Sequence, residues 1–351
     1  MPTKRTTLGA LTLLAACAFP AVPSEAQEHK ITVVSYGGAY TQSQREAFYK
    51  PFTAATGVRV QEEDAVEAWP QVKAQIEAGK VTWDVVNGET ATILQGCETG
   101  LLEPFDWKLV DKSKLIPEAV TECGVGGIVQ ASVIAYDADK IKGDTPKTVA
   151  DFWDLKKFPG KRGVRKTPIT TLEFALMADG VPHDKIYQVL ATKEGVDRAF
   201  RKLDEIKPSI VWWESSSSPP QLLADGEVAM TTSWNGRITQ AKRADKKNFV
   251  IVWDGQNYDV DFWGVVKGAP NKEEAMKFIA SATDPQKQAK QMDYVAYGPT
   301  AVAAMAILPA DFAAELPSSP ANLKQGIRND AKFWAEHLED LQARFQAWLS
   351  K

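Results

Sequence analysis

The sequence predicts an α/β protein of two lobes, in which parallel-rich sheets are flanked by helices. One observation behind this prediction is size: the chain has 351 residues, of which 44% are hydrophobic and 25% charged, which is enough for two domains with sizeable cores. The other is order: segments typical of strands alternate with segments typical of helices, over connections of a few residues. That alternation favours parallel strands with helices on their faces.

The first third of the chain holds three strand–helix pairs. A β-branched run at residues 31–34 is broken at Gly37, and Phe48 and Phe52 then share one helix face, which ends before Gly57. Glycine is the residue most often found just past a helix end. We expect strands at residues 31–34, 58–63 and 83–88, and helices at residues 41–56, 68–79 and 89–96.

The rest of the chain repeats this pattern in a looser form. Thr148, followed three residues later by Asp151, indicates the start of a helix. We expect strands at residues 126–137, 209–214, 227–234, 248–253 and 261–268, and helices at residues 147–155, 170–180, 195–207, 219–226, 271–284, 285–293 and 330–349.

The N-terminus has the pattern of an export signal. Lys4 and Arg5 precede a short apolar run at residues 8–19, and small residues before Ala26 suit cleavage after that residue. We therefore expect a signal peptide at residues 1–26 and a periplasmic protein. An alternative is a lipoprotein anchored through Cys17, which ends the sequence "LAAC".

Export bears on the cysteines. Removal of residues 1–26 leaves Cys97 and Cys123 in an oxidising compartment, where an even pair favours a disulfide. The alternative is two buried free thiols. Redox catalysis is disfavoured, because the sequence has no Cys-x-x-Cys motif.

The sequence lacks the motifs of the common enzyme classes. Its three histidines are scattered, which disfavours a catalytic triad, a metal site or a bound cofactor. The net charge of -4 leaves no broad basic surface for nucleic acid. The alternative that stays open is an exported hydrolase acting through paired carboxylates such as Asp259 and Asp261.

Several predicted strands end in turns that combine aromatic, charged and small polar residues. Ligands of open α/β sheets bind beyond the carboxyl ends of the strands. An exported protein with such turns and no catalytic motif points to the capture of a solute. The turns are residues 35–40, 86–90, 212–218, 232–237, 258–264 and 296–300.

At these turns the chain resembles a known family. The ordered series "SYGGAY", "WDVVNG", "TVADFWDLKKFPGKRG", "LLADGEVAMTTSWNG" and "YGPT" is similar to the spermidine/putrescine-binding group of periplasmic solute-binding proteins of ABC transporters. The resemblance implies a type II periplasmic-binding fold with a hinge between the lobes, and delivery of solute to ABC permease membrane subunits. It implies one lobe of residues 27–136 and 262–305, and another of residues 137–261 and 306–351. We expect a monomer.

The resemblance also implies roles for individual residues. Asp261 matches a carboxylate that pairs with a ligand ammonium, and Trp234 matches an aromatic wall. An ammonium held in this way gains a charge-assisted hydrogen bond and cation–π attraction of roughly 0.5–2 kcal/mol. Further expected contacts are Tyr36, Tyr40 and Tyr297 as aromatic walls, Asn87, Glu89 and Thr90 as a hydrogen-bonding loop, and Ser215 in the serine run.

The sequence departs from the polyamine pattern at one end of the ligand. A diamine needs acids at both ends, but the matched loops carry basic residues, including Arg237 next to Trp234. An Asp261–Arg237 pair suits an ω-amino acid such as 4-aminobutyrate, because an arginine can hold a carboxylate in bidentate fashion. Structural roles are the alternatives: a core position for Trp234, an interlobe salt bridge for Arg237, and a hinge or cap for Asp261.

Overall fold

The computed structural model describes residues 1–3, 29–65 and 68–351. The predicted cleavage site after Ala26 and the alternative lipid site Cys17 lie outside the described residues. Within the described residues, the search for a helix of sufficient length and apolarity to span a bilayer finds none.

One hydrogen-bonded sheet runs through the whole molecule, in the order β2-β1-β3-β8-β4-β7-β5-β6. Three strands at one end are parallel to one another, and three at the other end are as well. These strands are β1 (Lys30–Ser35), β2 (Arg59–Asp64) and β3 (Val85–Glu89) at one end, and β5 (Arg162–Arg165), β6 (Ile210–Trp213) and β7 (Met230–Trp234) at the other.

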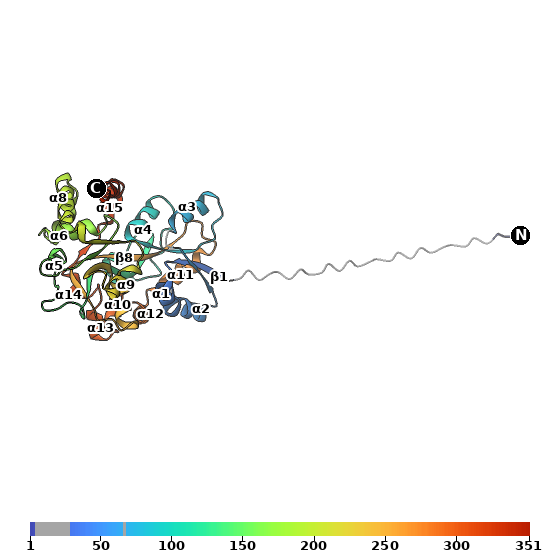
Figure 1. The fold of residues 1–351 in the computed structure, drawn as a ribbon. Coiled ribbons are helices and arrows are strands. Elements are labelled where there is room, and N and C mark those ends of the chain that lie inside the picture. Colours follow the sequence, from blue (N-terminus) through green and yellow to red (C-terminus); the bar gives the residue numbers. More distant parts are fainter. Residues whose placement is uncertain (4–28, 66–67) are drawn as a thin grey trace.

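Two long antiparallel strands, β4 (Gly124–Asp137) and β8 (Phe249–Val265), connect the two ends of the sheet. Figure 1 shows β8 crossing the middle of the molecule. The pairing of β4 with β8 is irregular near Gly126 and again near Ser132, and Gly255 of β8 adopts a positive φ of 70°. The short strands β9 (Gly298–Pro299) and β10 (Ile327–Arg328) pair with β4 and β8.

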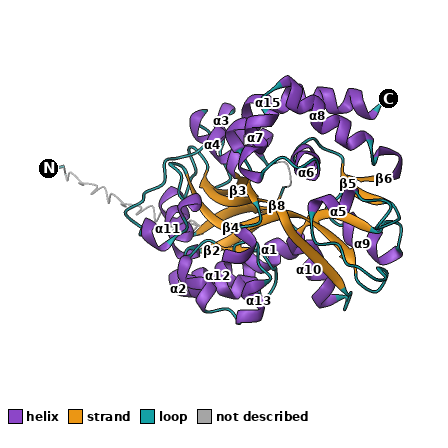
Figure 2. Cartoon of the chain, turned by 90° about the vertical axis from the view of Figure 1, so that its left-hand side faces the viewer, coloured by secondary structure: helices purple, strands orange, loops and turns teal. Residues whose placement is uncertain are grey.

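Helices cover both faces of this sheet (Figure 2). Around the β1 end lie α1 (Gly38–Gln44), η1 (Arg45–Tyr49), α2 (Lys50–Thr56), α3 (Trp69–Glu77), α4 (Thr90–Glu98), η2 (Lys112–Lys114), η3 (Pro117–Ala119), α11 (Lys272–Ala282) and α12 (Pro285–Met292). The remaining helices are α5 (Val149–Trp153), α6 (Thr171–Ala178), η4 (His183–Lys185), α7 (Ile186–Leu190), α8 (Lys193–Asp204), η5 (Lys207–Ser209), α9 (Ser218–Asp225), α10 (Asn235–Ala244), η6 (Val302–Ala306), α13 (Ala310–Ala314), α14 (Pro320–Leu323) and α15 (Ala331–Leu349).

The buried apolar side chains form separate clusters on either side of the crossing strands. Phe48, Trp263 and Phe278 belong to a cluster at the β1 end, whereas Phe174 and Phe345 belong to another that packs α6 and α15. Separate cores are what two lobes require. The lobe boundaries at residues 136/137, 261/262 and 305/306 stay a prediction.

Local signals in the sequence placed several helix ends correctly. Thr148 and Asp151 form a reciprocal capping box at the start of α5. Gly57 caps α2 in the left-handed conformation, with a φ of 77°. One prediction was wrong: residues 248–253 and 261–268 are not two strands, because the polar stretch between them continues the ladder of β8.

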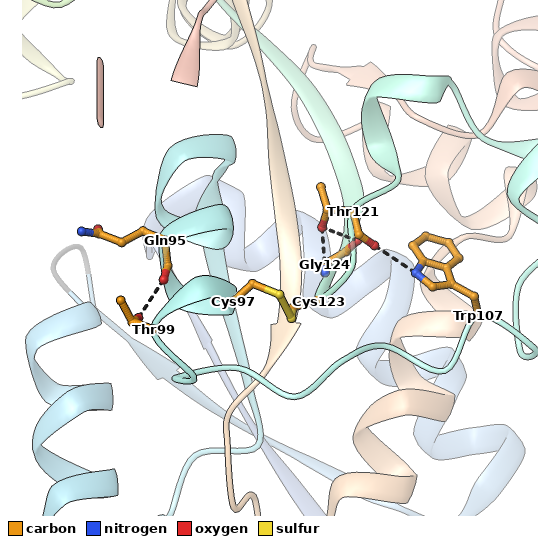
Figure 3. The surroundings of a disulfide bond; sticks show 7 residues. All are labelled: Gln95, Cys97, Thr99, Trp107, Thr121, Cys123 and Gly124. Atoms are coloured by element: carbon orange, nitrogen blue, oxygen red, sulfur yellow. Dashed lines mark hydrogen bonds between the residues drawn. A yellow bond between two sulfur atoms is a disulfide. The ribbon is translucent and has the colours of Figure 1, made fainter. Parts of the chain in front are cut away.

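A disulfide joins Cys97, near the end of α4, to Cys123, the residue before β4 (Figure 3). Their Cα atoms are 5.6 Å apart. Next to the bridge, the hydroxyl of Thr121 donates to the carbonyl of Gly124 and accepts from its amide nitrogen. The bridge therefore ties the far end of α4 to the start of a crossing strand.

Removing this bridge is expected to weaken the fold without changing it. The paired substitution Cys97→Ser and Cys123→Ser releases a loop that spans 26 residues in sequence, which lowers the free energy of unfolding by about 3 kcal/mol in the loop-entropy account. Urea denaturation monitored by circular dichroism measures the difference. The wild-type protein treated with reductant serves as the control, since it should match the double variant. Equal midpoints for oxidised wild type and double variant would contradict the expectation.

Candidate ligand-binding site

Three tyrosines gather beside the crossing strands at the β1 end. Tyr36 directly follows β1, Tyr40 lies in α1, and Tyr297 directly precedes β9. The rings of Tyr36 and Tyr40 are 5.8 Å apart, and those of Tyr40 and Tyr297 are 6.1 Å apart and nearly perpendicular. They form one connected aromatic group at the carboxyl end of β1.

Tyr297 also packs against the start of α10. A Cβ atom on Gly236 would lie 2.5 Å from the Tyr297 ring, so this close approach needs glycine. The adjacent Asn235 donates from Nδ2 to the carbonyl of Ala296 at 2.6 Å and accepts the amide hydrogen of Ala131 at 3.1 Å. The Asn-Gly pair that follows Trp234 thus fixes Tyr297 and β4 to the first turn of α10.

Three acidic residues lie next to the tyrosines on two neighbouring strands. Glu89 at the end of β3 is the register partner of Asp261 in β8. Asp259, two residues before Asp261, shares its face of the strand because side chains alternate. Asp259 and Asp261 are only 6% and 7% exposed, whereas Glu89 is exposed.

The two buried carboxyl groups differ in their hydrogen bonds. Asp259 Oδ1 accepts from the hydroxyl of Thr90 and from the amide of Val260. Burial, reinforced by the charge of Glu89, nevertheless raises the pKa of Asp259 to about 7. Burial raises the pKa of Asp261 well above its usual range, and the charges of Glu89 and Asp259 add to that rise. Asp261 Oδ1 is buried without a hydrogen-bond partner among the described residues.

The charge of Asp261 acts on all three tyrosines. Burial raises the pKa of Tyr36 and of Tyr40 well above the usual value, and Asp261 is the next largest cause for each. Burial raises the pKa of Tyr297 to about 12, an effect that Arg237 opposes and Asp261 reinforces. Asp261 therefore lies near all three tyrosines, whose hydroxyl groups stay neutral.

A second group of side chains lies where β5, β6 and β7 end. Arg165, Trp213 and Trp234 are the last residues of these strands. The guanidinium carbon of Arg165 is 4.4 Å from the Trp234 ring centroid, and the Trp213 and Trp234 rings are 5.6 Å apart. This is the edge of a parallel sheet at which ligands bind.

The strand register relates the acidic group to this tryptophan group. Asp261 is paired with Ile128 of β4, and Trp234 is paired with Ser132, four residues further along the same strand. That separation corresponds to about 13 Å along the strand. Side chains paired directly across antiparallel strands share a face, so Asp261 and Trp234 lie on one face of the sheet.

Two further polar side chains lie on this face between them. Gln130 is paired with Asp259, and Asn257 is paired with Ser132. Gln130 Oε1 and Asn257 Oδ1 are buried and have no hydrogen-bond partner among the described residues. Buried acceptors of this kind are normally satisfied, and a bound solute is one way to satisfy them.

Three residues predicted to contact ligand have other surroundings. Asn87 is buried and committed to protein partners, since it accepts from Gln44 at 3.2 Å and donates to the carbonyl of Phe262 at 3.2 Å. Ser215 is exposed, and its hydroxyl lies 2.9 Å from that of Ser217. Arg237 lines a cavity of about 310 Å³ between α9 and α10. Tyr36, Tyr40, Glu89, Thr90, Asp261 and Tyr297 are brought together, and Trp234 faces them along β4.

The sequence interpretation named Arg165 only as one of the basic residues in the matched loops, and it gave Trp213 no contact with the ligand. The short strand β5, "RGVR", was not predicted, so the position of Arg165 at a strand end was not evident. Gln130 and Asn257 were missed because only the pairing of β4 with β8 shows that they share a face with Asp261. In the described part of the chain, no group of three His, Cys, Asp or Glu side chains could hold a metal ion.

A sheet with two crossing strands and an enclosed acidic–aromatic site at its strand ends defines a solute-binding protein. Residues 47–318 match the model of the bacterial extracellular solute-binding proteins, and the chain belongs to that family. A relative from Pseudomonas aeruginosa, the gamma-aminobutyric acid-binding protein, is 45% identical over 332 residues, which are 94% of each chain.

Solved structures agree with this assignment. A structure of an ABC transporter substrate-binding protein from Bradyrhizobium japonicum has a TM-score of 0.84 and 37% identity, and the match covers 91% of this chain and 99% of that one. The structure of the Atu4243 GABA receptor has a TM-score of 0.82 and 35% identity, over 92% and 98% of the two chains. The predicted class, a binding protein and not an enzyme, is confirmed by these relatives, and the carboxylate-dependent hydrolase has no support.

Proposed function

We propose that this protein is the periplasmic substrate-binding protein of an ABC importer, and that it captures an ω-amino acid such as 4-aminobutyrate and delivers it to permease subunits. The observation that carries the proposal is that a buried acid, Asp261, and Trp234 lie on one face of the sheet, with the guanidinium carbon of Arg165 4.4 Å from the Trp234 ring centroid. A ligand with an ammonium at one end and a carboxylate at the other is complementary to that arrangement. The gamma-aminobutyric acid-binding protein and the GABA receptor among its relatives support this choice.

The ammonium group is held at the acidic end. Asp261 supplies a charge-assisted hydrogen bond through Oδ1, and Glu89 and Asp259 add negative potential. The rings of Tyr36, Tyr40 and Tyr297 exclude water, and cation–π attraction from each ring that faces the ammonium contributes roughly 0.5–2 kcal/mol.

The carboxylate is held at the tryptophan end, near Arg165 and Arg237. The guanidinium carbon of Arg165 lies 4.4 Å from the centroid of the Trp234 ring. Arg237, the residue that the sequence favoured, acts electrostatically on Tyr297 from the first turn of α10. A diamine fits this end less well, because Glu214, which follows β6, is already paired with Lys166 at 3.0 Å.

Access of the ligand to Asp261 requires the two halves of the molecule to separate. Tyr297 bridges them, since it contacts Tyr40 on one side and Gly236 of α10 on the other. The crossing strands, with their irregular pairing near Ser132 and the positive φ of Gly255, are the hinge of this motion. Ligand shifts the equilibrium toward the closed form because it contacts both halves only there. The predicted signal peptide and the similarity to a putrescine-binding periplasmic protein of Pseudomonas aeruginosa support an exported protein. That it acts as a monomer stays a prediction.

Isothermal titration calorimetry of residues 27–351 tests the function. 4-Aminobutyrate is expected to bind with a stoichiometry of one and, at one hundred times its Kd, to stabilise the fold by about 2.7 kcal/mol. Putrescine should bind more weakly, and 4-aminobutyramide, which lacks the carboxylate, should lose most of the affinity. Failure to bind any of these amines would overturn the proposal. If putrescine bound most tightly, the ligand class would be a diamine and not an ω-amino acid.

A further inference from the structure

We propose that the empty site stores a proton on Asp261 and that capture of the ligand ammonium releases this proton to solvent. The inference rests on the proposed function, because it concerns the charge balance of the same site. Because binding releases a proton, the affinity for the ligand should rise as the pH rises.

The geometry of the acidic cluster is the first step. Glu89 and Asp261 are register partners on adjacent strands, and Asp259 lies on the same face two residues away. Asp259 and Asp261 are both more than nine-tenths buried. Two buried carboxyl groups on one face of a strand, with the charge of Glu89 next to them, disfavour each other's ionised form, so Asp259 and Asp261 together hold a proton when no ligand is bound.

The hydrogen bonds assign the proton to one residue. Asp259 Oδ1 receives two donors, the hydroxyl of Thr90 and the amide of Val260, and donors of that kind stabilise the ionised form. Asp261 Oδ1 receives none from the described residues. The neutral acid is therefore placed on Asp261, in agreement with the raised pKa of that residue.

Among the described residues, the groups that act on Asp259 and Asp261 bring little positive charge to these two buried carboxyl groups. Tyr36 and Tyr40, from the β1–α1 segment, and Tyr297 are neutral, since burial raises the pKa of each. Arg237 of α10 acts on Tyr297, and Arg328 of β10 lowers the pKa of Asp259 as the smallest of the effects on it. The ligand ammonium would bring a positive charge and a donor to Asp261 Oδ1.

The exchange is balanced in atoms and charge. The O–H bond of Asp261 breaks and its proton passes to solvent, while the ligand ammonium keeps its three protons and donates one N–H to the carboxylate that is left. The ligand does not change its own protonation between pH 6 and 8, because alkyl ammonium groups titrate near 10 and aliphatic carboxyl groups near 4. A released proton therefore comes from the protein.

Calorimetry in two buffers counts the protons. Titration of residues 27–351 with 4-aminobutyrate at pH 7, in phosphate and in Tris, gives enthalpies that differ by the number of protons released times the difference in buffer ionisation heat. We expect about one proton per ligand, and a dissociation constant about tenfold larger at pH 6 than at pH 7.

A variant and a matched control locate the source. Glu89→Gln removes a neighbouring negative charge, which lowers the pKa of Asp261 in the empty site, so proton release at pH 7 should fall below that of wild type. Glu77→Gln changes another exposed acid, on α3, which is paired with Lys73 at 3.8 Å, and should leave proton release as in wild type. Melting temperatures of both variants check the fold.

The outcomes separate this inference from the proposed function. Binding of 4-aminobutyrate with equal enthalpies in both buffers and constant affinity from pH 6 to 8 would overturn proton release and leave the function intact. Proton release that Glu89→Gln and Glu77→Gln change alike would overturn the assignment to the acidic cluster. Failure of both 4-aminobutyrate and putrescine to bind would overturn the proposed function, and this inference with it.

Discussion

Asparagine in place of Asp261 is expected to abolish detectable binding of 4-aminobutyrate and, at the same time, to raise the melting temperature of the ligand-free protein. Asparagine keeps the size of the side chain but removes the charge that the ligand ammonium meets in a buried site. Loss of one partner of a buried charged pair costs 2–5 kcal/mol, a reduction in affinity of about thirty- to several-thousand-fold. Calorimetry measures the first effect and differential scanning calorimetry the second.

The stability gain has a definite pH dependence. Burial raises the pKa of Asp261 above its unfolded value. The neutral acid contributes fully to stability below the unfolded value of roughly 4, and that contribution is lost as the pH rises toward the folded value. Asparagine does not titrate, so the advantage of the variant grows with pH, by about 2 °C in Tm for each kcal/mol recovered.

An exposed acid provides the comparison for Asp261→Asn. Asp311 lies in the first turn of α13 and is exposed, so Asp311→Asn should change neither affinity nor the pH profile of Tm. An Asp261→Asn protein that binds 4-aminobutyrate as tightly as wild type would remove this residue from the ligand site.

Replacement of Arg165 by methionine is expected to weaken the binding of 4-aminobutyrate by roughly 30- to 150-fold, equivalent to about 2–3 kcal/mol. The affinity for putrescine should stay nearly unchanged. Methionine keeps an unbranched apolar side chain against Trp234, so the loss reports the guanidinium group, which lies 4.4 Å from that ring. The measurement is the ratio of the two dissociation constants in variant and wild type.

Arg237→Met is the paired variant for Arg165→Met. Its selective effect on 4-aminobutyrate should be smaller, because Arg237 lines the cavity between α9 and α10 and acts on the site through Tyr297. If Arg237→Met loses more 4-aminobutyrate affinity than Arg165→Met, the ligand carboxylate contacts Arg237, as the sequence predicted. Equal losses for both ligands in both variants would contradict a site built for a zwitterion.

Much of the fold follows from local patterns in the chain. Alternating strand and helix segments predicted the element order, and Gly57 and Thr148 marked helix ends where the structure has them. β8 was divided in two because residues 254–260 carry too many polar side chains for a buried strand. Those polar residues include Asp259 and end next to Asp261, so the strand pattern is broken where this face serves the ligand.

The site could be predicted only as a set of candidates. Asp261 and Tyr297 follow from strand ends and the family resemblance, but their grouping depends on which strands pair. The register of Glu89 with Asp261, and of Trp234 with Ser132, joins segments far apart in the sequence. Arg165 acquires its place from the parallel pairing of β5 with β6 and β7, which no local pattern indicates.

The helix α4 is anchored at both of its ends. Its first residue, Thr90, is hydrogen-bonded to Asp259 of β8, and Cys97 near its last turn is covalently joined to Cys123 beside β4. Because α4 is attached to both crossing strands, it cannot shift along them. The helix therefore holds the acidic side of the site in a fixed position. The displacement that admits a solute is therefore left to the opposite wall, where Tyr297 packs against Gly236 of α10 beside the hydrogen bond from Asn235 to the carbonyl of Ala296.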